Sequence, residues 1–162
     1  MNYPSPQALA GRFHFNTRLI HMQTRGLTHA ESLLQLPFRG NCFNWVVGHI
    51  LTSRDACLRL LEQPATLSAE QLAVYDRGSE PLTHAEQAAP LEDLLAKLDE
   101  ADRCLSAALE PLDEAELARA VTFGRDPQPL GEVLAFLQWH ETYHLGQLEL
   151  LRQLAGKDDK VV

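Results

Sequence analysis

The chain has 162 residues, 45% of them hydrophobic, and its 14 lysines and arginines against 22 aspartates and glutamates give a formal net charge of −8. This length and composition favour a single domain, residues 1–162, with a core large enough to need no disulfide. An acidic chain without a basic cluster is a poor partner for nucleic acid or for an anionic membrane surface. No apolar run approaches the roughly 20 residues that span a bilayer.

The first residues and the cysteines favour a cytoplasmic protein. The start, Met-Asn-Tyr-Pro-Ser-Pro, has neither the basic nor the apolar stretch of a secretory signal. Cys42, Cys57 and Cys104 are odd in number and widely spaced, as expected of reduced thiols in a cytosol.

Two long helices are expected in the first half of the chain. The first begins after Ser5, with Pro6 at its first position, and ends before Gly26. The second covers about residues 44–62 and is stopped by Pro64.

Two more long helices are expected in the second half. The third follows Pro90, where leucines recur at the 3.6-residue period of a helix: Leu91, Leu94, Leu95, Leu98, Leu105, Leu109 and Leu112. The fourth follows the breaker-rich residues 124–129 and ends near Gly156. Four long amphipathic helices in one domain predict an all-α helix bundle.

Shorter elements are expected in the connections. Residues 28–31, 68–71 and 83–86 each fit the capping box, and the segment that opens at Ser68 predicts a short helix. Residues 63–89 provide a crossover between the second and third long helices. No stretch alternates between apolar and polar residues with β-branched enrichment, so we predict no sheet.

His140 and His144 stand four residues apart on the fourth helix, so their side chains project from one face. The rest of that face is apolar, with Val133, Leu137, Leu148 and Leu151 in line. Two imidazoles buried there without partners would be costly, and a shared divalent metal removes that cost.

His49 is the natural third ligand, because it lies in an otherwise apolar stretch of the second helix. The alternative is a core histidine satisfied by its neighbours. Metal sites in bundles are built from side chains that converge from facing helices, which favours the ligand interpretation. Gly48 would either let another helix approach closely or have a plain packing role.

Residues 140–144 also match the His-Glu-x-x-His signature of zinc proteases, in which the glutamate is a general base. The extended signature requires Gly and His where Gln147 and Leu150 stand, which disfavours a protease. Glu141 is left with three interpretations: a catalytic base, a group that orients a ligand, or a solvated helix glutamate.

Two motifs together resemble the DinB/YfiT-like superfamily of small four-helix metal-binding proteins. They are Asn-Trp-Val-Val-Gly-His-Ile-Leu at residues 44–51 and Trp-His-Glu-Thr-Tyr-His-Leu-Gly-Gln-Leu at residues 139–148. Leu145 stands where the family motif commonly has arginine. The resemblance implies a left-handed up-down-down-up bundle, frequently dimeric, with a divalent metal held by His49, His140 and His144.

The resemblance also bears on function, because several members of this superfamily are thiol-dependent S-transferases and others are described as metal-dependent hydrolases. Three neutral imidazoles leave coordination positions open, as in catalytic sites, and they suit zinc, nickel, iron, copper or manganese. The leading hypothesis is a metal-dependent S-transferase that joins a low-molecular-weight thiol to a small electrophile, with Glu141 as proton acceptor. The alternatives are a metal-dependent hydrolase and a non-catalytic bundle that binds metal or ligand or serves in dimerisation. The expected partners are a small-molecule substrate and a second copy of the chain.

Overall fold

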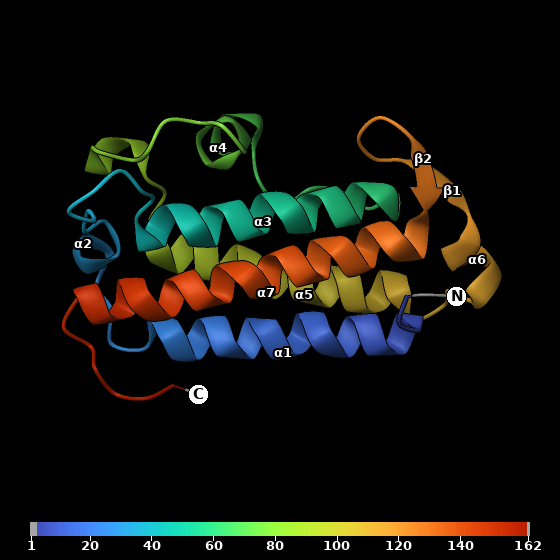
Figure 1. Cartoon of the computed structure of the whole chain (residues 1–162), viewed down its shortest axis with the longest axis horizontal. Helices are drawn as coiled ribbons and strands as arrows, with labels where there is room; N and C mark the ends of the chain where they lie inside the picture. The colour runs from blue at the N-terminus through green and yellow to red at the C-terminus, as the bar shows by residue number, and fades with distance from the viewer. Residues whose placement is uncertain (1–2, 162) are drawn as a thin grey trace.

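The computed structural model describes residues 3–161, and its architecture is a bundle of four long helices. These are α1 (Pro6–Thr24), α3 (Phe43–Leu60), α5 (Leu91–Leu109) and α7 (Leu130–Leu154). α1 and α3 occupy opposite corners, and each packs against both α5 and α7. In Figure 1, α1 and α7 run from right to left, whereas α3 and α5 run from left to right. The predicted all-α fold class is confirmed.

The ends of the first two long helices follow local chemistry. Ser5 caps α1 by accepting a hydrogen bond from the backbone N–H of Ala8. α3 ends two residues earlier than predicted, because Glu62 adopts a left-handed φ of 58°. The backbone N–H of Gln63 then donates to the carbonyl of Leu58 at 2.8 Å, a closure typical of helix C-termini.

Four short helical elements fill the connections: α2 (His29–Ser32), α4 (Ala69–Tyr75), the 3₁₀ turn η1 (Ala85–Gln87) and α6 (Glu114–Ala118). The capping boxes that begin at Thr28 and Ser68 are confirmed, with both reciprocal hydrogen bonds present. The one expected at residues 83–86 is wrong, because His84 precedes η1 and no side chain caps that turn.

The prediction of no sheet is wrong, because two short strands pair between α6 and α7. β1 (Ala120–Thr122) and β2 (Pro127–Pro129) are antiparallel, with Val121 opposite Gln128. Strands of three residues are too short to show alternation in the sequence. Prolines are tolerated in β2 because it is an edge strand. Figure 1 shows the hairpin at one end of the bundle, beside the first turn of α7.

The core runs along the inside of all four long helices, and it contains several buried polar side chains as well as aliphatic ones. Within residues 3–161, none of the helices combines the length and the apolarity needed to cross a bilayer.

Candidate metal centre

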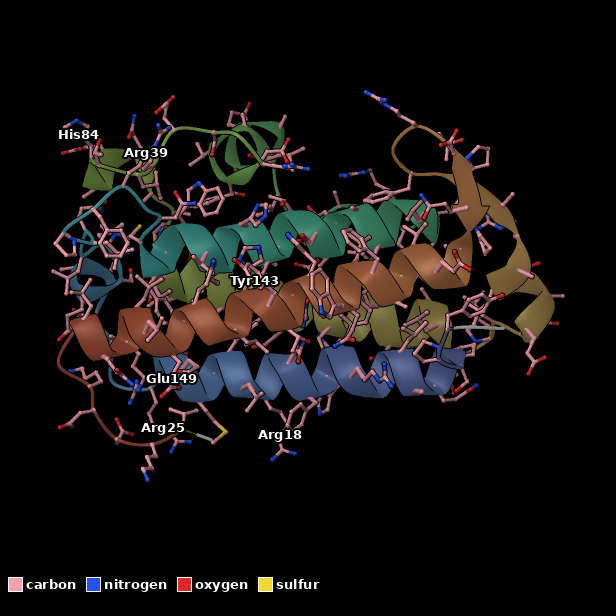
Figure 2. All side chains as sticks on the ribbon, viewed as in Figure 1. Arg18, Arg25, Arg39, His84, Tyr143 and Glu149 are labelled. Atoms are coloured by element: carbon pink, nitrogen blue, oxygen red, sulfur yellow. The ribbon has the colours of Figure 1, made fainter. Side chains whose placement is uncertain are left out.

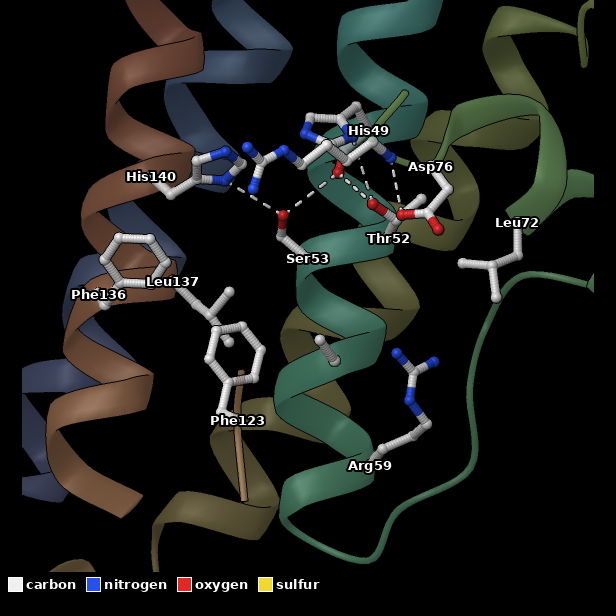
Figure 3. A pocket seen from close by; sticks show the side chains of 12 residues that line it. His49, Thr52, Ser53, Arg59, Leu72, Asp76, Phe123, Phe136, Leu137 and His140 are labelled. Carbon is white, nitrogen blue, oxygen red and sulfur yellow. Dashed lines mark hydrogen bonds between the residues drawn. The ribbon is translucent and has the colours of Figure 1, made fainter. Parts of the chain in front are cut away.

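Three histidines from two helices meet inside the bundle. His49 comes from α3, and His140 and His144 come from one face of α7, as predicted. One ring nitrogen of each histidine lies within 4.8 Å of the others. The Nε2 atoms of His140 and His144 are 3.2 Å apart. Figure 3 shows His49 and His140 pointing toward one another across the space between α3 and α7.

The outer nitrogens of two of these rings are held by acceptors. Nδ1 of His49 donates to the backbone carbonyl of Tyr75 at 2.8 Å. Nδ1 of His144 donates to the Oε1 atom of Gln147 at 2.7 Å. An acceptor at Nδ1 fixes the proton there, so Nε2 of each ring presents a lone pair to the interior.

Ser53 gives the third ring the same orientation. The Ser53 hydroxyl donates to the carbonyl of His49 at 3.4 Å, and it lies 3.3 Å from Nδ1 of His140, from which it accepts. His140 therefore also presents Nε2 toward the other two rings.

Burial keeps the three imidazoles neutral. Burial is the main cause that lowers the pKa of His49 and His140, and it lowers the pKa of His144 to about 4. In the tautomer with its proton on Nδ1, each ring turns the lone pair of Nε2 toward the other two rings. This donor set fits a divalent cation, which neutral imidazole nitrogens bind well.

The α3 motif around His49 fixes the position of the Tyr75 carbonyl. A Cβ atom at Gly48 would overlap the ring of Tyr75, so glycine is required for the close approach of α4. The Tyr75 hydroxyl donates to Oδ1 of Asn44 at 2.9 Å and accepts from the backbone N–H of Ala89 at 2.8 Å. Of the two roles considered for Gly48, the structure shows the close approach of another helix.

The two tryptophans of the motifs differ in their surroundings. Trp45 is buried and stacks on His49 with ring centroids 4.7 Å apart, and its Nε1–H lies within hydrogen-bond distance of two acceptors near the end of α4. Trp139 is 59% exposed on the outer face of α7. Trp45 thus packs against the three-histidine cluster, whereas the exposed side chain of Trp139 lies on the outer face of the bundle.

Glu141 is not a solvated helix glutamate, because its side chain is fully buried. Its two carboxylate oxygens accept from Nε and Nη2 of Arg54, at 3.0 and 2.7 Å. The outer nitrogens of the three histidines are held by other groups, so Glu141 does not orient them directly. Its position in a closed ion pair gives no support to a role as catalytic base.

Arg54 is equally buried and joins all four long helices. Beside Glu141, it donates to the carbonyls of Leu98 and Phe13, and Asp102 lies 3.9 Å away. Burial works against the charge of Arg54, but the Glu141 and Asp102 carboxylates more than offset it and raise the pKa of the guanidinium.

A pocket of about 470 Å³ opens beside the three-histidine cluster. One wall is a stripe along α3: His49, Thr52, Ser53, Ala56 and Arg59. The others come from α4 and the turn after it (Leu72, Asp76, Arg77), from α7 (Phe136, Leu137, His140) and from Phe123 in the hairpin. Figure 3 shows these side chains around the opening. The three-histidine cluster is therefore accessible to a small molecule through His49 and His140.

Sequence reasoning missed the partners of the histidines and the Arg54–Glu141 pair. Arg54 carried a usable signal, because it falls on the same helical face as the buried residues Ile50, Leu51 and Leu58. A charged residue at a core position predicts a buried partner.

A family model described as the DinB superfamily matches residues 12–148. The chain belongs to this superfamily. A solved structure of a conserved protein from Enterococcus faecalis is similar, with a TM-score of 0.70 and 16% sequence identity over 92% of this chain and 95% of that chain. At this identity the likeness shows the shared fold. No curated protein matches the chain.

Proposed function

We propose that His49, His140 and His144 hold a divalent metal, and that this DinB-superfamily chain is a metal-dependent S-transferase. It would join a low-molecular-weight thiol to a small electrophilic substrate. The observation that carries the proposal is the convergence of three neutral Nε2 atoms at the edge of an open pocket. Three protein ligands leave further positions free, which is the pattern of a catalytic centre.

A bound divalent metal would supply one chemical function, which is to lower the pKa of a thiol or a water molecule. The protein residues supply the rest. Phe123 and Phe136 shield one side of the pocket from water, and Thr52 and Ser53 offer hydroxyl groups for orienting a substrate. Transfer forms a sulfur–carbon bond, the leaving group departs with its electron pair, and the thiol proton needs an acceptor.

Asp76 is better placed than Glu141 to take that proton. Among residues 3–161, Asp76 is the one residue with a carboxylate that lines the pocket, and its side chain is exposed. Glu141 is closed off by Arg54. We therefore assign the proton acceptor to Asp76 rather than to Glu141.

A metal-dependent hydrolase is the second candidate, because the polar lining beside the histidines would serve an attacking water equally well. Asp76 would then accept the proton of that water. The pocket disfavours the non-catalytic alternative, since a purely structural cluster needs no access from solvent.

The first test is the metal content of the untagged protein, measured by mass spectrometry beside a His140→Ala/His144→Ala double variant. We expect about one divalent metal per chain in the parent and none in the variant, with helical circular dichroism preserved in both. Absence of metal from the parent after reconstitution with zinc, nickel, iron and manganese would overturn both enzyme proposals.

The second test separates the two reactions in the metal-loaded protein. A panel of electrophiles is incubated with and without added low-molecular-weight thiol, and products are identified by mass. A thioether product that forms only with thiol supports the S-transferase, and turnover without thiol supports the hydrolase.

The resemblance also implies a homodimer, and we propose that the chain forms one. The support is a row of exposed side chains on the outer face of α7, with Phe136, Trp139, Tyr143 and Leu150 each about half exposed or more. Sedimentation velocity tests it, with Trp139→Ser expected to shift the protein toward the monomer.

A further inference from the structure

The pocket is elongated along α3. His49 and Arg59 both line it and are ten residues apart on one helix, which corresponds to about 15 Å along the axis. Thr52, Ser53 and Ala56 line it between them. Figure 3 shows Arg59 at the end of the pocket away from His49. A ligand that filled this space would extend from the metal centre to Arg59.

The charge of the pocket is opposite to that of the chain. The chain carries a net charge of −8, yet the pocket is lined by two arginines and one aspartate. Within residues 3–161, neither the Arg59 nor the Arg77 guanidinium has a carboxylate at ion-pair distance or a hydrogen-bond acceptor. Guanidinium groups stay charged and match carboxylates in a planar, two-bonded geometry.

Arg77 lies at the histidine end. It lines the pocket two residues after Tyr75, whose carbonyl accepts from Nδ1 of His49 at 2.8 Å. The side chain of Asp76 accepts a hydrogen bond from the backbone N–H of Arg77 at 2.7 Å, so this aspartate does not neutralise the Arg77 guanidinium by pairing with it. Arg59 is the cation at the other end.

The wall of the pocket on the side of α7 and the hairpin is aromatic. The rings of Phe123 and Phe136 have centroids 6.3 Å apart, and the rings of Phe136 and His140 have centroids 6.2 Å apart. This aromatic wall runs from the hairpin to the metal centre, and Leu72 lines the pocket from α4. Phe123 of the hairpin thus forms the part of this wall that is nearest to the hairpin.

We propose that the pocket binds an extended organic anion with its carboxylate against Arg59, its apolar middle against Phe123 and Leu72, and its far end at His49 and His140. This rests on the proposed function only in placing the reacting group at the histidine end. Arg59 would bind the carboxylate through two parallel hydrogen bonds, which adds orientation to affinity. The pocket would then select substrates by length and charge.

The test measures binding rather than turnover, on protein stripped of metal with a chelator. 4-Phenylbutanoate and its neutral amide are titrated by calorimetry at low salt. We expect the carboxylate to bind about 10-fold more tightly than the amide, because a charged hydrogen-bond pair replaces a neutral one. Raising the salt concentration should reduce this preference, since the arginine is solvent-exposed.

Matched variants test whether Arg59 binds the carboxylate. Arg59→Gln should bring the carboxylate preference close to 1, and Arg59→Lys should keep part of it. Arg18→Gln removes the same charge from α1, where Figure 2 shows the side chain pointing away from the bundle, and should leave the preference unchanged. Phe123→Ala should weaken both ligands by the same factor.

The outcomes separate this inference from the metal proposal. The His140→Ala/His144→Ala variant should retain the carboxylate preference even though it cannot bind metal. Binding of neither ligand, equal binding of acid and amide, or a preference that survives in Arg59→Gln would each overturn the inference, whatever the metal content.

Discussion

Residues 140–144 of α7 take part in two buried polar clusters, the three-histidine centre beside the pocket and the Arg54–Glu141 pair in the core. In the pair, the guanidinium donors meet the Glu141 carboxylate and the carbonyls of Leu98 and Phe13. In the histidine centre, the three outer nitrogens have partners, and the three inner ones face each other at the edge of the pocket.

The difference teaches how to recognise a binding site among buried polar residues. A cluster that contains both donors and acceptors is complete and holds the fold together. A cluster that presents only acceptors to a common point is incomplete without a cation. His140, Glu141 and His144 lie within five residues of sequence, so only the three-dimensional geometry shows which of them belongs to which cluster.

The largest effect on stability should come from breaking the complete cluster. Glu141→Leu leaves the buried Arg54 charge with only the Asp102 carboxylate, 3.9 Å away, to compensate it, and it should lower the free energy of unfolding by about 3–5 kcal/mol. Urea denaturation of the metal-free protein measures it. Arg54→Met/Glu141→Leu, which removes both charges, should recover most of the loss. A cost below about 1 kcal/mol for the single variant would contradict the structural role assigned to the pair.

Gly48→Ala should have the next largest effect, because the added methyl group overlaps the Tyr75 ring. We expect a loss of about 1–3 kcal/mol in the free energy of unfolding. Metal affinity should fall as well, since the Tyr75 carbonyl that holds His49 must move. Gly146→Ala on α7 is the matched control: a Cβ there meets no atom within 4 Å, so it should be neutral or stabilising by up to about 1 kcal/mol. If both variants had the same stability and metal affinity, contact with Tyr75 would not be what positions His49.

The four long helices and the three histidines were predictable because both depend on local patterns. Helical periodicity decides which face of α7 is buried, and a spacing of four places His140 and His144 on that face. The capping residues Ser5 and Ser68 predicted where α1 and α4 begin, because a helix cap is also a local feature.

The partners that complete each cluster were not predictable, because they depend on how distant helices align. Ser53 and His140 are 87 residues apart, as are Arg54 and Glu141. Sequence spacing within one helix carries no information about register against another. Residues 120–129 were also missed, because pairing of so short a hairpin depends on its place against the end of α7.

Gln147→Leu tests whether the histidine centre depends on its outer partners. Without the acceptor at Nδ1, His144 loses its fixed tautomer, and zinc affinity should fall about 10–100-fold. Competition with a chromophoric chelator measures it. Gln153→Leu, an exposed glutamine on the same helix, is the control and should leave zinc affinity unchanged. An unchanged affinity in Gln147→Leu would mean that convergence of the rings alone holds the metal.

The smallest effect is the pH dependence of the metal-free protein. Unfolded imidazoles take up protons near pH 6.5, whereas burial lowers the pKa of His144 to about 4 in the folded chain. Between these values the unfolded state binds a proton that the folded state refuses, so the free energy of unfolding falls as the pH is lowered. For His144 the loss should be on the order of 1 kcal/mol at pH 5.5.

Denaturation at pH 7.5 and pH 5.5 isolates this contribution when variants are compared. His144→Gln should lose less stability between the two pH values than the parent, because its side chain takes up no proton. His84→Gln replaces an exposed histidine outside the cluster and should follow the parent. If the parent showed the same pH dependence as His144→Gln, burial would not lower the pKa of His144. The histidine centre would then not differ from the Arg54–Glu141 pair by presenting unprotonated nitrogens.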